Sequence, residues 1–110
     1  MKMSNVKKMP KTYSDVVVDS IQAVDATVAV ADGEELAVGT ALTSTDGGKT
    51  FSKAVDGDGV VVNGILTEIL DAPGVANVLV TGKVKVPEEL AGDITDRMAK
   101  SAFENKIILL

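Results

Sequence analysis

From Ser14 onward, apolar and polar residues follow the short, turn-bounded runs that are typical of β-strands. Six such runs are DVVVDSIQ (15–22), ATVAVA (26–31), LAVGTALTS (36–44), TFSKAV (50–55), VVVNGILTEIL (60–70) and VANVLVTGKVKV (75–86). The segments between them are rich in Gly, Asp and Pro, which favour turns: DGEE (32–35), TDGG (45–48), DGDG (56–59) and DAPG (71–74). Strands at this spacing predict a small barrel or sandwich-like sheet in a single, mainly β domain.

One segment near the C-terminus has a helical period instead. Ile94, Met98 and Ala102 recur every four residues and would form one apolar stripe. Asp93 is placed to cap this helix, and Asp96 would lie near the positive end of its dipole. A turn or short helix is expected at 87–90, so the prediction is one short C-terminal helix on a β-rich domain.

Both ends of the sequence attract attention. Residues 1–13 show neither a strand nor a helix period and include Pro10, so we expect a flexible arm followed by a domain at 14–110. The sequence finishes on four apolar residues, Ile107, Ile108, Leu109 and Leu110. These residues are expected either to close the core as a last strand or to meet another copy of the chain.

Composition removes most catalytic chemistry. The 110 residues contain no Cys and no His, so a thiolate nucleophile and the commonest general base and metal ligand are absent. Aromatic residues are limited to Tyr13, Phe51 and Phe103, too few for the stacking platforms of single-stranded nucleic-acid binders. The acidic residues fall at turns and on exposed strand positions. We therefore expect no enzyme and no cofactor.

Charge is unevenly distributed along the chain. The net charge is −5, but residues 1–11 hold four lysines and no acid, whereas the remaining 99 residues hold 7 basic and 16 acidic residues. An acidic body repels nucleic-acid phosphates and anionic lipid, so neither nucleic acid nor membrane is expected as a partner. No apolar run approaches a membrane span or a signal-peptide core, which favours synthesis in the cytoplasm.

Two motifs imitate ligand sites without meeting their requirements. DGDG at 56–59 suggests a calcium loop, but the twelfth position from Asp56 is Thr67 where a bidentate Glu is needed. TDGGKT suggests a phosphate loop, but Thr43 stands where the motif needs its first Gly, and the segment leads into a strand. We interpret the first as a hairpin turn and expect no metal site.

Three blocks of the sequence do resemble a known family. AVGTALTS with VVVNGILTEI, VLVTGKVKVPEEL, and RMAKSAFENKIILL follow one another in the order found in the head decoration proteins of lambda-like tailed phages. The resemblance covers Val38 to Leu110 and has a Lys- and Pro-bearing arm ahead of the sheet. The chain departs from the lambda type in lacking Trp and a Pro-rich arm.

The resemblance implies a β-clip-like fold and a non-enzymatic virion protein. Such a protein would be made in the host cytoplasm and would cement the outside of the expanded head as a homotrimer, at sites where subunits of the major capsid protein meet. The arm would order on the capsid. Its expected contact residues are Val6, Lys7, Lys8, Met9, Pro10, Lys11, Thr12 and Tyr13, and strand addition to a neighbouring sheet is one mode available to it.

Two other classes of function remain open. The first is a trimeric β enzyme, for instance one that hydrolyses nucleotides, although the acid and aromatic lid of such a pocket are not recognisable. The second is a fibre-base or host-surface-binding module in which the sheet serves oligomerisation.

Overall fold

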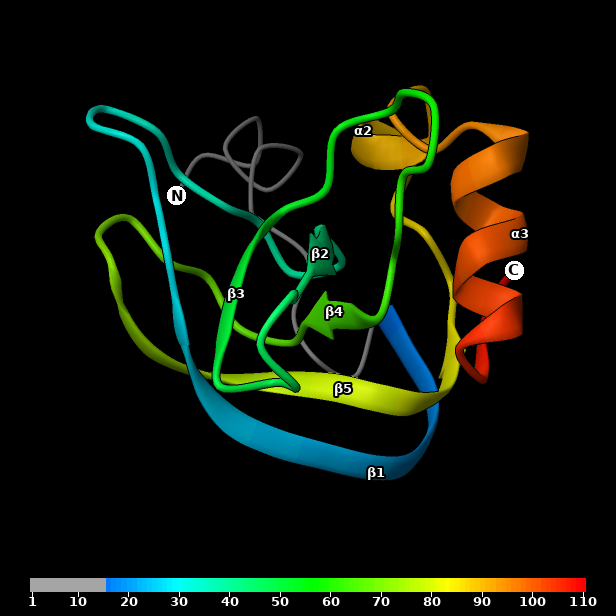
Figure 1. Cartoon of the computed structure of the whole chain (residues 1–110), viewed down its shortest axis with the longest axis horizontal. Coiled ribbons are helices and arrows are strands. Elements are labelled where there is room, and N and C mark those ends of the chain that lie inside the picture. The colour runs from blue at the N-terminus through cyan, green and yellow to red at the C-terminus, as the bar shows by residue number, and fades with distance from the viewer. Residues whose placement is uncertain (1–15) are drawn as a thin grey trace, which may run out of the picture.

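The computed structural model describes residues 16–110, which form one β-rich domain with two helices beside the sheet (Figure 1). The elements are β1 (Val17–Val28), β2 (Ala41–Thr43), β3 (Thr50–Lys53), β4 (Gly64–Leu66), β5 (Gly74–Val84), α2 (Glu88–Ala91), α3 (Asp96–Glu104) and β6 (Ile107–Leu109). The prediction of a mainly β domain with a short C-terminal helix is therefore confirmed.

The strands close into a small barrel. Their order is β1-β3-β2-β4-β5-β6, and a further pairing of β1 with β5 joins the two sides. That pairing is antiparallel and runs from Val28 opposite Gly74 to Val17 opposite Val84. On its other edge β1 pairs with β3 in parallel only at Thr27 and Val28. The two long strands thus form a curved ribbon under the three short ones (Figure 1).

The two strands expected at 15–22 and 26–31 are one strand, β1. Its register against β5 shifts between Val17 and Asp19, between Ser20 and Gln22, and between Gln22 and Ala23. Such irregularities insert residues without ending the strand and increase its local bend. The sequence offered no sign of this continuity, because the polar residues between the apolar runs predicted a break.

Two of the short strands, β2 and β4, are buried on both faces. β2 and β4 occupy three residues each, far fewer than the apolar runs that contain them. In β4, Ile65 packs into one apolar cluster beneath α3 while its neighbour Leu66 packs into a second cluster around Phe51. Neither residue is exposed at all. This double burial explains why the sequence shows consecutive apolar residues here instead of alternation.

Gly64 lets these layers approach. A Cβ atom on Gly64 would stand 2.7 Å from Cε2 of Phe51 and 2.7 Å from Cγ1 of Val78, closer than carbon atoms can pack. The GIL segment therefore begins with the one residue that leaves room for the Phe51 ring.

Helix α3 begins later than the sequence predicted. Asp93 does not cap it; Thr95 does, and its Oγ1 accepts a hydrogen bond from the Met98 amide at 3.3 Å. Ile94 consequently lies before the helix, although it still packs against the core. The cap moved because both residues are acceptable caps and only the tertiary position of Thr95 distinguishes them.

The chain reverses sharply after α3. Lys106 has a φ of 71°, a left-handed conformation that non-glycine residues adopt rarely, and its amide donates to the Phe103 carbonyl at 3.0 Å. The turn places β6 parallel to the end of β5, with Gly82 opposite Ile107 and Val84 opposite Leu109. The expected last strand is thus present over three of the four apolar residues.

Burial within the last strand predicts two contrasting substitutions. Ile107 is fully buried, whereas Leu110 is 62% exposed. Ile107→Ala should lower the free energy of unfolding by about 2–5 kcal/mol, and Leu110→Ala by less than about 1 kcal/mol. Urea denaturation of the two variants checks this.

Removing residues 107–110 altogether should leave a chain that is unfolded or strongly destabilised, because small domains have only about 5–15 kcal/mol of stability. A truncated chain that melts like the full chain would show that β6 adds nothing to the core.

Candidate functional site

The sequence singled out two sets of residues, 6–13 and 107–110, and the structure describes only the second set. The expected capsid contacts at 6–13 lie outside the described residues 16–110. Of the C-terminal set, Ile107 is buried, Ile108 and Leu109 are half-buried, and Leu110 is exposed. The core therefore takes the first of these side chains, while the last remains available for contact with another molecule.

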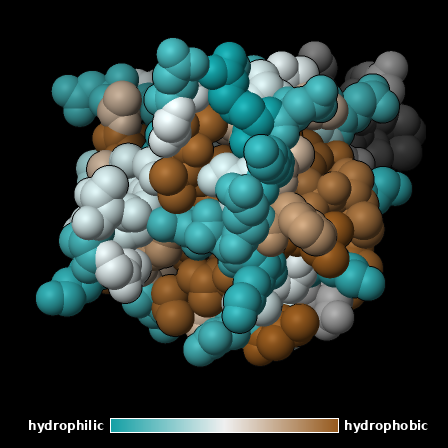
Figure 2. All heavy atoms as spheres, turned by 45° about the vertical axis from the view of Figure 1, so that its right-hand side comes forward, coloured by the Kyte–Doolittle hydropathy of each residue, from teal (hydrophilic) through white to brown (hydrophobic). Residues whose placement is uncertain are grey.

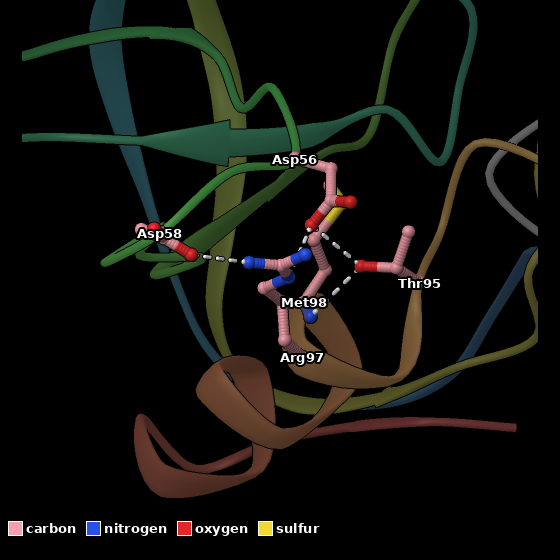
Figure 3. A network of polar contacts seen from close by, with 5 residues as sticks. All are labelled: Asp56, Asp58, Thr95, Arg97 and Met98. Carbon is pink, nitrogen blue, oxygen red and sulfur yellow. Dashed lines mark hydrogen bonds and ion pairs between the residues drawn. The ribbon is translucent and has the colours of Figure 1, made fainter.

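The DGDG segment is a clamp on α3 and not a hairpin turn. Arg97 lies between its two acids, with Nε 3.0 Å from Oδ1 of Asp56 and Nη1 2.9 Å from Oδ1 of Asp58 (Figure 3). Thr95 donates its hydroxyl to the same Asp56 oxygen at 2.9 Å. The two acids thus hold the first turn of α3. The interpretation as a hairpin turn was wrong because the flanking strands β3 and β4 do not pair with each other; β2 lies between them in the sheet.

A second set of bonds attaches α3 to the barrel. The buried amide of Val62 donates to Oγ of Ser101 at 2.9 Å, and the Val62 carbonyl accepts from Nδ2 of Asn105 at 3.2 Å. Ser101 and Asn105 are one helical turn apart and face the same residue of the loop. Ser101 supplies the acceptor and Asn105 the donor, so together they bond the backbone of Val62 as a neighbouring strand would. This bonding satisfies the backbone of the loop that leads into β4.

Shallow hollows flank this clamp. One of about 350 Å³ lies between the 59–61 segment and the outer part of α3, lined by Val61, Arg97, Lys100, Glu104 and Asn105 among others. Another of about 320 Å³ lies on the other side of Asp56, near Val55 and Asp93. Arg97 and Asn105 in the first hollow, and Asp56 and Thr95 in the second, already make internal bonds, so both hollows present polar groups that the fold itself uses.

The 44–50 turn is organised around one carboxylate. Asp46 accepts hydrogen bonds from the hydroxyl and amide of Thr50, from the hydroxyl of Ser44 and from the amide of Lys49. The bonds from Thr50, supported by those from Ser44 and Lys49, hold the pKa of Asp46 far below its usual 3.8. The TDGG segment is therefore a self-contained turn, as the sequence predicted.

Apolar side chains are exposed at several places around the barrel. On the face that α3 occupies, hydrophilic side chains run down the middle and hydrophobic surface lies to both sides (Figure 2). Phe103 on α3 is 67% exposed, and Val55 is 74% exposed. At the start of β1, Val18 and Ile21 are 57% and 70% exposed. Side chains of this size at the surface are candidates for contact with another protein.

Within residues 16–110, no group of three or more acidic, His or Cys side chains is close enough to hold a metal ion. No helix in this part of the chain is long and apolar enough to span a bilayer. In comparisons with known proteins, no family model, curated protein or solved structure matches the chain.

Sequence reasoning missed the clamp for a physical reason. Asp56 and Arg97 are far apart along the chain, and single acids and bases in loops are ordinarily solvated surface. The Arg97 residue in the predicted helix was the only available signal, and it does not identify its partners.

The Thr95 cap predicts a measurable loss. Thr95→Ala removes the bond to the Met98 amide and the bond to Asp56, so the free energy of unfolding should fall by about 1 kcal/mol, within the usual range of 0.5–2 kcal/mol for a cap. Thr45→Ala, in an exposed turn, is the matched control and should change stability by less than about 0.5 kcal/mol. Equal effects of the two substitutions in urea denaturation would contradict the role of Thr95.

The Asp46 turn predicts a pH dependence. Since the pKa of Asp46 is lower in the folded chain than its usual 3.8, the unfolded chain binds the proton more readily. The stabilisation is therefore complete above about pH 4 to 5 and is lost as the pH falls below that. In Asp46→Asn, unfolding free energy should depend less steeply on pH between about pH 4 and 2 than in the wild type.

Asp32→Asn makes the same charge change in another turn and serves as the control. It should keep the wild-type slope. If Asp46→Asn also kept that slope, the Asp46 carboxylate would not be the group that holds this turn.

Proposed function

We propose that this protein decorates a phage capsid: it binds the outside of the expanded head at three-fold sites as a homotrimer and stabilises the shell. The observation that carries the proposal is where the resembling segments lie. They contain β2, β4, residues 78–84 of β5, α3 from Arg97 onward, and β6, and these strands are consecutive neighbours in the sheet order. A resemblance in adjacent strands of one structural unit is stronger support than the same residues scattered over the surface.

The attachment of the N-terminal segment also supports this function. Val16 is buried, with 1% of its surface exposed, and its carbonyl accepts a hydrogen bond from the Lys85 amide at 2.7 Å. From there β1 continues along β5 for the whole length of the ribbon. A pull on the preceding residues would therefore be carried into the longest pairing of the barrel, as a cement protein under tension requires.

The arm gives the decisive experiment. A chain that begins at Ser14 should melt like the full chain but fail to decorate heads that lack the protein, because the arm carries the capsid contact and no part of the core pattern. Replacing the four lysines of residues 1–11 by Gln is the matched control. It should weaken binding only in part and mainly at low salt, since exposed charges are screened within about 10 Å at 0.1 M ionic strength.

Electron microscopy of the decorated heads reads out both results. Density grouped in threes at the capsid three-fold positions is expected for the full chain. Full occupancy by the shortened chain would assign the capsid contact to the barrel instead. Single copies without three-fold grouping would overturn the trimer, and stronger binding to host cells than to heads would favour a host-surface module.

A further inference from the structure

Acidic side chains gather at one end of the β1–β5 ribbon. The loop after β1 and the loop before β5 lie together there, because Leu36 and Leu70 exchange backbone hydrogen bonds of 2.7 and 3.0 Å. The two loops form the left side of the molecule in Figure 1. They carry five acids, namely Asp32, Glu34, Glu35, Glu68 and Asp71. We call this set the acidic end; Lys53 pairs with Glu34 at 3.7 Å, which neutralises only part of the charge.

The other end of the ribbon has the opposite character. Lys83 and Lys85 at the end of β5 and Lys106 before β6 are all exposed. We call these three residues the basic end. Two acids of the sequence accompany them, Asp19 opposite Lys83 in the strand register and Glu104 at the end of α3.

Each end also exposes apolar side chains. At the basic end these are Val18 and Ile21, which are 57% and 70% exposed. At the acidic end they are Ile69 and Val75, which are 39% and 69% exposed. Apolar groups with charged residues around them are the usual composition of a protein interface, where the former supply burial and the latter orientation.

The two ends lie on opposite sides of one copy (Figure 1). β5 spans eleven residues between them, which corresponds to at most roughly 36 Å at about 3.3 Å per residue, because the ribbon is curved. Their charges are opposite and their apolar groups are similar in number, so each is a suitable partner for the other end of a second copy.

We propose that copies of this chain associate head to tail, with the basic end of one copy on the acidic end of the next. A two-fold contact centred on either end would oppose like charges, and a side-by-side two-fold pair that joins both ends would close at two copies, which sedimentation equilibrium would reveal. A head-to-tail contact that repeats with closing rotation produces a ring. The inference rests on the proposed function only for the number of subunits in the ring, which is three. It adds which surfaces form the contact between subunits.

Cross-linking of isotopically mixed protein tests which surfaces meet. Equal amounts of ¹⁴N- and ¹⁵N-labelled full chain are mixed at low salt over a range of concentrations and treated with a carbodiimide, which joins lysines to carboxylates in contact. Peptides that contain one light and one heavy partner report contacts between copies. We expect these to join Lys83, Lys85 or Lys106 to the carboxylates at 32–35 and 68–71. Mixed peptides that involve only lysines of residues 1–11, that join other surfaces, or that are absent at every concentration would overturn the proposal.

Charge reversal tests the same contact without chemical modification. Lys83→Glu with Lys85→Glu, and separately Glu35→Lys with Asp71→Lys, should each weaken association by about tenfold or more, because like charges then face each other. The chain with all four substitutions has the wild-type net charge and should associate like the wild type. Glu88→Lys with Asp93→Lys is the charge-matched control for the acidic end and should leave association unchanged.

Association is measured by sedimentation equilibrium, with melting curves to show that every variant folds. If the variant with all four substitutions melts like the wild type but does not regain wild-type association, the head-to-tail contact is overturned. The proposed function is judged separately by decoration of heads. If the variants decorate heads in groups of three, but combining the four substitutions does not restore association, the head-to-tail contact is wrong and the decoration function still holds.

Discussion

The antiparallel pairing of β1 with β5 is the interaction on which the rest of the structure depends. It closes the row of strands into a barrel, and it brings residues 17–28 alongside residues 74–84. Because the paired strands are long and the other strands have only three or four residues, the short strands have little stability of their own. β2 and β4 are held by burial on both faces, whereas β3 buries only Phe51 and is otherwise exposed.

Helix α3 completes the core by a different means. Its apolar side covers the cluster that contains Ile65 and Ile107, while polar side chains at Ser101 and Asn105 bond the backbone of Val62. The Asp56–Arg97 contact adds an exposed ion pair, which contributes at most about 1 kcal/mol. The attachment of α3 therefore relies mainly on burial and on satisfied backbone groups, and the ion pairs fix the position of the loop.

The proposed function and the proposed subunit contact use different parts of this framework. The N-terminal segment enters at a buried, hydrogen-bonded Val16, and the two charged ends are held apart by the length of the ribbon. In the two proposals, the barrel contacts a neighbouring copy at each end and residues 1–13 bind the capsid. The two proposals therefore assign the subunit contact and the capsid contact to different residues.

The sequence by itself determined the β class, the turn at Asp46, the helix stripe through Met98 and the last strand, because periodicity and turn residues act locally. It did not determine the unbroken β1, since bulges are tolerated only when β5 lies alongside to pair with the rest of the strand. It did not show the Asp56–Arg97 clamp or the gathering of charge at two ends either. These features depend on residues that are distant in the chain, and only the tertiary structure decides which of them become neighbours.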